Sequence, residues 1–210
     1  MWDTVGALGI PDVASWFPFS RKRYRFHDTE LSKIVRYAYQ ALALDEHRAD
    51  FKPTKWTRLP GNLAPGESST SKKPGQIEVE QRWFVGAHAD VGGGEKTDGA
   101  GHSPDPLPDL PLAWMQQKAR GAGLAFTGAF VPLPNAELGV PNNSYAQFMY
   151  GIYKLFKKPI ERTFDAGVNE TVDESVWLRW REVADYRPPT LTDAIASGEV
   201  MPPPDIAQMA

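Results

Sequence analysis

A histidine inside a glycine-rich segment offers the clearest chemistry in this sequence. His88 lies in Gly86–Gly94, directly after the apolar run Trp83–Val85. An apolar run ending in glycines is typical of a strand that enters a tight loop, which would hold the histidine at the edge of a sheet. The stretch Trp2–Gly6 looks like a second strand end and bears Asp3. A histidine and an acid that orients its ring are the acid–base half of a hydrolytic triad.

Other interpretations of these residues stay open from the sequence. His88 could be an ordinary loop histidine, and Asp3 a capping or turn residue. The glycines also suggest a phosphate-binding loop, but that motif places a glycine directly before Lys-Thr. Glu95 occupies this place in Gly92–Thr97 and would repel a phosphate, so the motif is not met.

A metal site is a further alternative, built from His88, Asp90, His102 and Asp105. Their spacing matches no standard set of metal ligands, which favours a solvated loop. Asp90 is better placed to brace the loop by accepting backbone N–H groups. No metal and no cofactor are therefore predicted.

Helices and strands must position these residues. The apolar residues Leu31, Ile34, Val35, Ala38 and Leu42 recur at helical spacing. Residues 77–85 alternate and then turn apolar, which predicts a strand entering a buried sheet. Capping residues, glycines and prolines bound the predicted helices, which span residues 28–48, 109–121, 144–156 and 171–180.

Composition restricts the class of protein. The chain has 210 residues, 41% of them hydrophobic, which is enough for one sizeable core. A net charge of −3 with both signs interspersed gives no case for nucleic-acid binding, and the absence of cysteine excludes disulfides and thiol chemistry. No apolar run is long enough to span a membrane and no signal peptide is evident, so we expect a soluble protein. It could stay in the cytoplasm or leave by a route that needs no signal peptide.

Two segments are predicted to be irregular. Residues 16–26 combine aromatic and basic side chains, which fits a packed loop better than a contact with substrate or an anionic surface. Residues 53–75 are rich in Pro, Gly, Ser and Lys and predict a mobile loop.

Several segments together resemble one family of proteins. Their order along the chain is similar to that in the α/β-hydrolase family of type VI secretion phospholipase effectors. The matching pieces are Trp2–Gly6, Phe26–Ser32, Ala41–Arg48, Gln81–Gly94 and Asp109–Met115, with weaker echoes in 151–155 and 175–188.

The resemblance implies an α/β fold in which Asp3 is the triad acid and His88 the triad base. It implies hydrolysis of phospholipid or other esters without metal or cofactor. Residues 1–190 would form the C-terminal part of an α/β-hydrolase catalytic domain, and residues 191–210 an irregular tail.

The family's nucleophile is a serine on a Gly-x-Ser-x-Gly elbow that precedes the acid. None of the serines has that context, because Ser20 precedes Arg-Lys-Arg while Ser68, Ser69 and Ser71 lie in the predicted loop. We therefore expect a fragment without the nucleophile and without its oxyanion donors, inactive alone. The missing N-terminal half or an immunity protein would be its partner. The alternative is a non-catalytic remnant that binds lipid or a protein.

Overall fold

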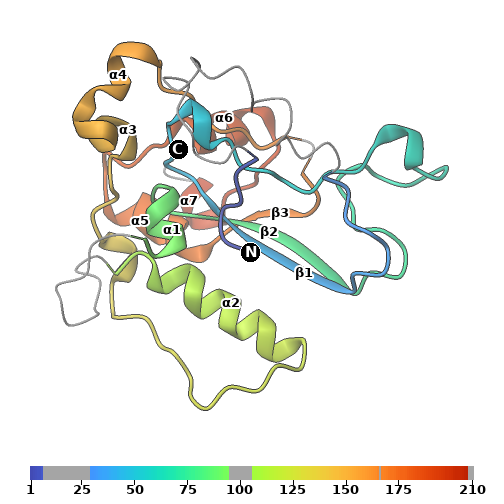
Figure 1. Ribbon diagram of the computed structural model, residues 1–210. Helices are drawn as coiled ribbons and strands as arrows, with labels where there is room; N and C mark the ends of the chain where they lie inside the picture. Colours follow the sequence, from blue (N-terminus) through green and yellow to red (C-terminus); the bar gives the residue numbers. More distant parts are fainter. Residues whose placement is uncertain (7–28, 95–105, 166, 208–210) are drawn as a thin grey trace.

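A parallel sheet forms the centre of the protein (Figure 1). The computed structural model describes residues 1–6, 29–94, 106–165 and 167–207. Within them the strand order is β1-β2-β3, with β1 at Tyr37–Ala43, β2 at Glu78–Phe84 and β3 at Glu170–Val172. The N-terminus lies along β1, where Trp2 forms a parallel bridge with Ala41. The predicted α/β class is consistent with this sheet and the helices around it.

Helices connect the strands and cover the sheet. None in the described part of the chain is long and apolar enough to cross a membrane. The helices are α1 (His88–Gly92), α2 (Asp109–Gly121), α3 (Ser144–Gln147), α4 (Tyr153–Phe156), α5 (Glu174–Glu182), α6 (Pro189–Ser197) and α7 (Pro204–Ala207), and the 3-10 turns are η2 (Ala49–Phe51), η3 (Pro60–Asn62), η4 (Ala136–Leu138) and η5 (Phe148–Gly151).

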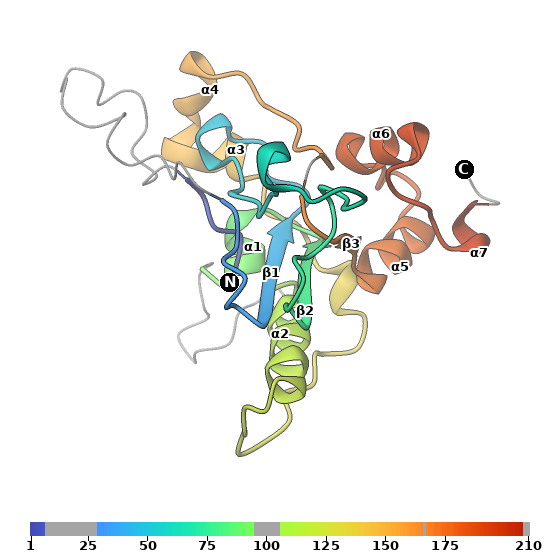
Figure 2. The ribbon, with the colours of Figure 1, turned by 90° about the vertical axis from the view of Figure 1, so that its right-hand side faces the viewer.

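Both faces of the sheet are buried, because neighbouring residues of a strand point to opposite sides. On one face Leu42 and Trp83 pack with Trp180 of α5 in the larger core cluster, which also includes residues of α6 and α7. On the other face Phe84 packs against Trp114 of α2, with ring centroids 5.5 Å apart. Figure 2 shows α2 and the α5–α7 group as separate blocks around the strands.

The predicted strand at 77–85 and the predicted helix at 109–121 are confirmed as β2 and α2. The helix predicted at 171–180 is present as α5, and it begins after Asp173, whose carboxylate accepts from Ser175 N–H. The helix predicted at 144–156 is broken instead. Tyr150 and Gly151 adopt positive φ angles of 56° and 83°, which an α-helix does not contain, and they separate α3 from α4.

The helix predicted at 28–48 is wrong, because residues 37–43 form strand β1. Ala41 and Leu42 are both fully buried, one on each face of the sheet. A strand buried on both faces lacks clean alternation, so its apolar residues matched a helical spacing by chance. Ile34, which a helix would have buried, is 81% exposed.

The segment 191–210 is not the irregular tail that was expected. It contains most of α6 and all of α7, and Leu191 and Ile206 are buried in the larger core cluster. The prolines that suggested irregularity stand at the starts of these helices, where a missing N–H costs no hydrogen bond.

Residues 53–75 are largely irregular, apart from η3, and their mobility stays a prediction. Buried side chains fasten them to the body, since Trp56 and Arg58 are each less than a tenth exposed. The aromatic and basic stretch 16–26 lies outside the described residues.

Gln81 in β2 makes the attachment that we expect to matter most for stability. Its buried side chain accepts from Trp56 N–H at 2.7 Å and donates to the carbonyls of Trp56 and Val168 at 3.0 Å. Gln81→Leu would remove the partner of Trp56 N–H and of Val168 O, whereas Trp56 O keeps its hydrogen bond from Val168 N–H, and it should lower the free energy of unfolding by about 2–4 kcal/mol in urea denaturation. Lys33→Gln, at an exposed position, should change it by less than about 0.5 kcal/mol. Equal stability of the two variants would contradict this role.

Candidate active site

Asp3 lies at the edge of the sheet, beside the end of β1. Its N–H donates to Ala41 O at 2.7 Å, which continues the bridge made by Trp2. Asp3 has a φ of 37°, in the left-handed region, and its side chain is fully buried. One carboxylate oxygen, Oδ1, accepts from Ala43 N–H at 2.9 Å. The backbone thus holds this acid in one orientation.

His88 follows β2 after a sharp turn. Gly86 makes the turn with a φ of 106°, and a Cβ atom there would lie 2.5 Å from Asp90 Cβ, so no other residue fits without movement. The glycine-rich loop expected over 86–94 is only partly present, because the turn at Gly86 leads directly into helix α1, which begins at His88. Asp90 braces it as expected, since its Oδ2 accepts from Ala87 N–H at 2.7 Å and Asn142 N–H at 3.0 Å.

The structure brings the two predicted site residues together. His88 Nδ1 lies 2.7 Å from Asp3 Oδ2, within hydrogen-bond distance. The side chain of His88 is 30% exposed, whereas the acid behind it is fully buried. A proton on Nδ1 directed at the acid leaves Nε2 with a free lone pair, the state required of a general base.

Arg162 forms a second contact with the acid, and sequence reasoning missed it. Its Nη1 and Nη2 donate to the two oxygens of Asp3 at 2.6 and 2.8 Å. The same guanidinium donates to the carbonyls of Ala43 and Phe51, each at 2.7 Å. Arg162 stands in an irregular segment before β3 and matches no motif. No local signal in the sequence could have paired it with an acid so far away.

Arg162 controls the charge of Asp3. Burial by itself would raise the pKa of this carboxyl, but the positive charge of Arg162 and the hydrogen bonds from His88, Arg162 and Ala43 outweigh it. Together they lower the pKa of Asp3 from 3.8 to about 2. The acid is therefore ionised across the neutral range and acts only as a hydrogen-bond acceptor toward the imidazole.

Two further acids follow β1, the half-buried Asp45 and the fully buried Glu46. Glu46 accepts from His88 N–H at 3.2 Å and from Arg48 Nε at 2.9 Å. Ser144 Oγ donates to Glu46 at 3.0 Å. Burial would raise the pKa of Glu46, but the contacts with Arg48 lower it overall. The sequence analysis assigned no role to these acids, although their position directly after a buried strand was a usable signal.

Asp45 fastens the turn before His88. Its Oδ2 accepts from Gly86 N–H at 2.7 Å and from Tyr186 Oη at 3.1 Å. Its backbone N–H donates to Gly86 O at 3.0 Å, which closes the contact from both sides. Burial raises the pKa of Asp45 to about 6, because these hydrogen bonds compensate only partly for the loss of water.

Aromatic rings line one side of His88. The Phe51 ring meets the imidazole edge-on at 5.2 Å between centroids, and Phe148 meets Phe51 in the same way at 5.9 Å. The Arg48 guanidinium lies 3.5 Å from the centroid of Phe51. These rings give the site an apolar wall beside the polar imidazole of His88.

No serine in the described part of the chain bonds to His88. Ser144 donates to Glu46, Ser68 bonds to Thr70, and Ser20 lies outside the described residues. The described part of the chain also includes no group of three acids or histidines that could hold a metal. His102 and Asp105 are outside that range.

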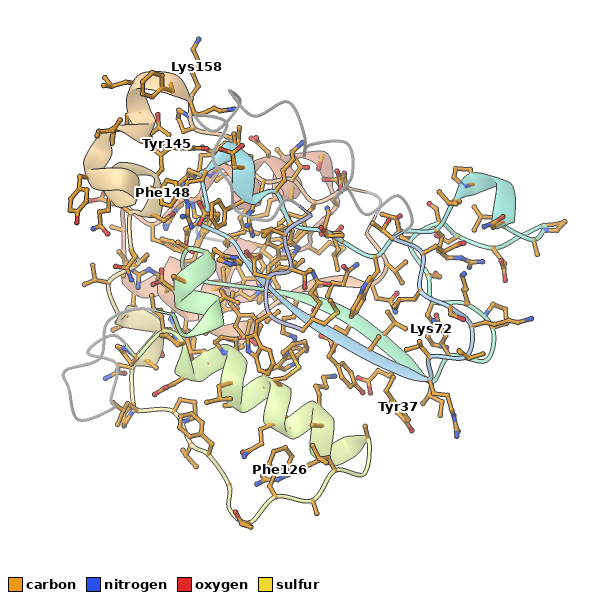
Figure 3. The ribbon with its side chains drawn as sticks, in the orientation of Figure 1. Tyr37, Lys72, Phe126, Tyr145, Phe148 and Lys158 are labelled. Atoms are coloured by element: carbon orange, nitrogen blue, oxygen red, sulfur yellow. The ribbon has the colours of Figure 1, made fainter. Side chains whose placement is uncertain are left out.

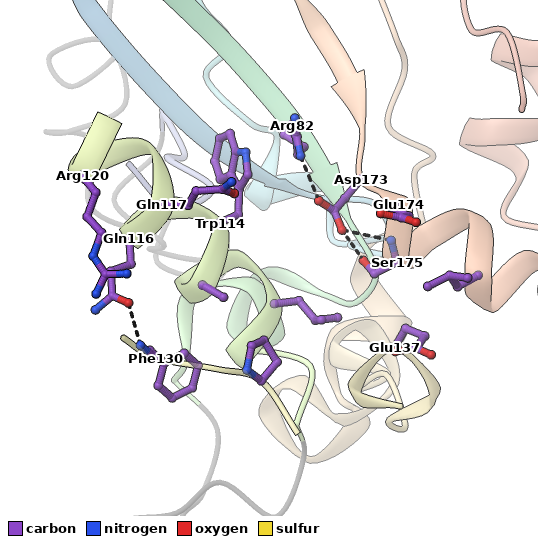
Figure 4. Close-up of a pocket in the computed structure, with 14 residues that line it drawn as sticks. Arg82, Trp114, Gln116, Gln117, Arg120, Phe130, Glu137, Asp173, Glu174 and Ser175 are labelled. Atoms are coloured by element: carbon purple, nitrogen blue, oxygen red, sulfur yellow. Dashed lines mark hydrogen bonds and ion pairs between the residues drawn. The ribbon is translucent and has the colours of Figure 1, made fainter. Parts of the chain in front are cut away.

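A separate cavity of about 480 Å³ lies between α2, β2 and α5 (Figure 4). Ser175 lines it, but its Oγ donates to Asp173 at 2.6 Å, and Asp173 in turn pairs with Arg82. Among the described residues, no histidine lines this cavity, so Ser175 has no imidazole partner there.

Comparison with known protein families identifies the family of this chain. The family model described as T6SS phospholipase effector Tle1-like, catalytic domain, matches residues 1–118. The chain belongs to this family. The match confirms the resemblance seen in the sequence and implies a lipid substrate. No match was found among curated proteins or among solved structures.

The matched range of the Tle1-like family includes Asp3, β1, β2 and His88. Arg162 and the helices α3 and α4 lie beyond it. Among the neighbours that the structure adds to the site, Asp45, Glu46 and Phe51 lie inside the matched range, whereas Arg162, Ser144 and Phe148 lie in a part of the chain that the family match does not describe.

The raised pKa of Asp45 predicts a specific pH dependence. The folded protein holds this proton up to pH about 6, whereas the unfolded chain releases it near 3.8. The stabilising contribution of Asp45 is therefore complete below pH 3.8 and is lost as the pH rises through 6. Asn cannot titrate, so the free energy of unfolding of wild type minus that of Asp45→Asn should fall by about 2 kcal/mol between pH 4 and 7.

This difference is measured by urea unfolding of both proteins at a series of pH values. All other titrating groups are common to both and cancel. A difference that stays constant over this range would contradict the raised pKa of the Asp45 carboxyl in the folded protein.

Proposed function

We propose that Asp3 and His88 are the acid and base of a serine-dependent hydrolysis of phospholipid esters. One observation supports the proposal most strongly. The imidazole Nδ1 lies 2.7 Å from a buried carboxylate that Arg162 keeps ionised. Membership of the phospholipase effector family supplies the class of substrate.

The chemistry requires a hydroxyl nucleophile beside Nε2 of His88. In the first step Nε2 takes the hydroxyl proton while the oxygen attacks the ester carbonyl, and the imidazolium returns that proton to the leaving alcohol. In the second step water gives a proton to Nε2 and attacks the acyl group, which releases the fatty acid and the free hydroxyl. Asp3 stabilises the imidazolium in both steps and takes no proton itself.

Arg162 has two opposing effects on this mechanism. It guarantees that Asp3 is a carboxylate and fixes its plane, which selects the useful tautomer of His88. It also offsets part of the negative charge that would stabilise the imidazolium. We propose that orientation is the more important contribution of Asp3 here, since a rotated carboxylate would leave Nδ1 without its partner.

We further propose that the nucleophile belongs to a serine outside the described residues, on the strand and elbow that complete an α/β-hydrolase fold. In that fold the serine precedes the acid, and the amide after it is an oxyanion donor. The lack of a serine at His88 within the described residues supports this assignment. An immunity protein or a complementing segment would be the expected partner.

Complementation tests this function. The chain alone should show no phospholipase activity above background. Activity should appear when a polypeptide with the Gly-x-Ser-x-Gly strand and elbow of a family relative is added. In the complemented enzyme, His88→Ala should lower kcat by at least about a thousandfold, because the general base is lost.

His47→Ala is the matched control, since the His47 side chain is 32% exposed and contacts Glu161 instead of the site. It should retain nearly full activity. Hydrolysis by the unaided chain that His88→Ala abolishes would reveal a nucleophile within it. A correctly assembled complex without activity would favour the non-catalytic, lipid-binding alternative.

A further inference from the structure

A small helical lobe, residues 142–158, lies beside the site and contains α3, η5 and α4. In Figure 1 it stands at the upper left, above the layers that surround the sheet. Figure 3 shows Lys158 of this lobe pointing away from the body of the protein. Its outward surface combines large exposed apolar side chains with an excess of positive charge.

Helix α4 presents its apolar side to solvent. Ile152, Leu155 and Phe156 have the i, i+3, i+4 spacing of one helical face, and they are 49%, 79% and 63% exposed. Tyr150, just before them, is fully exposed. Tyr153 instead points inward, where it is buried and its hydroxyl donates to Asp50 at 3.0 Å. The lobe is therefore anchored by Tyr153 and leaves four large apolar side chains outside.

The charge of the lobe is entirely positive. Residues 138–160 contain three lysines and no aspartate or glutamate, in a chain whose net charge is −3. Lys154 and Lys158 are exposed and flank Leu155 and Phe156. Exposed apolar side chains bordered by lysines are the chemistry that inserts into the boundary of an anionic bilayer, with the cations against the headgroups.

The lobe is continuous with the active site. Its Phe148 ring packs on Phe51, which packs on the imidazole of His88. Ser144, at the start of α3, donates to the same Glu46 carboxylate that accepts from His88 N–H. A bilayer resting on the lobe would therefore lie beside the segment whose Phe148 and Ser144 are linked to His88 through Phe51 and Glu46.

We propose that the 142–158 lobe is the surface through which this protein docks on an anionic phospholipid bilayer. The role of this docking rests on the proposed hydrolysis of phospholipids, but binding to the bilayer requires no catalysis. A second exposed apolar stretch follows α2 and includes Val131 and Leu133, which are 77% and 65% exposed. It has no lysine between residues 122 and 143, so it lacks the charge for such a surface and provides a matched control.

Vesicle flotation tests the docking. The protein should float with vesicles of phosphatidylglycerol and phosphatidylcholine, much less with pure phosphatidylcholine, and less in high salt. Leu155→Asp/Phe156→Asp should lower the partition coefficient at least about tenfold, because each side chain loses its burial in the bilayer. Lys154→Gln and Lys158→Gln should each lower it about fivefold.

Val131→Asp/Leu133→Asp, at side chains whose exposure matches that of Leu155 and Phe156, should bind as wild type does, and so should Lys33→Gln at an exposed position outside the lobe. The proposal is overturned if wild type does not prefer anionic vesicles, or if the control variants lose binding as strongly as the lobe variants. It is also overturned if the lobe variants bind vesicles normally and instead lose self-association in size-exclusion chromatography, which would make the lobe a protein interface.

Two further measurements separate docking from catalysis. His88→Ala should bind vesicles as wild type does, so a failure of the proposed hydrolysis leaves the docking result intact. In the complemented enzyme, Leu155→Asp/Phe156→Asp should hydrolyse a soluble short-chain ester normally and lose activity only on vesicles. Equal loss on both substrates would contradict a docking role.

Discussion

The buried carboxylate of Asp3 is the interaction on which the rest of the site depends. It accepts from Arg162 through both oxygens and from His88 through one. A buried acid without these partners would lose its charge or destabilise the fold. Arg162 also donates to Ala43 and Phe51 carbonyls. One ion pair therefore joins the N-terminus, the end of β1, the aromatic wall and the segment before β3.

The site is assembled at the edge where parallel strands end, and acids set its geometry. Asp45 holds the turn before His88, Glu46 holds its N–H, and Asp90 closes the turn from the other side. No hydrogen bond joins these three acids to the imidazole of His88. Each instead accepts from a backbone N–H of residues 86–88 and so fixes the backbone that positions the imidazole. Glu46 also accepts from Ser144 of the lobe, so His88 and the proposed lipid surface share one hydrogen-bond partner.

The sequence located the contact between Asp3 and His88 better than it predicted the fold around them. His88 and Asp3 could be found because glycines and strand ends leave a local pattern, and their family resemblance is confirmed by the match over residues 1–118. Strand β1 was mistaken for a helix, because burial on both faces removes the alternation that identifies a strand. Arg162 could not be found, since its pairing with Asp3 is a product of tertiary structure alone.

The tautomer of His88 tests the central claim most directly. At alkaline pH, where imidazoles are neutral, ¹⁵N NMR distinguishes a protonated ring nitrogen from a bare one. The account predicts that Nδ1 bears the proton and donates it to Asp3, with Nε2 bare and ready to accept. Asp3→Asn should abolish this preference. A wild-type spectrum in which Nε2 bears the proton, or in which both nitrogens exchange equally, would contradict the account.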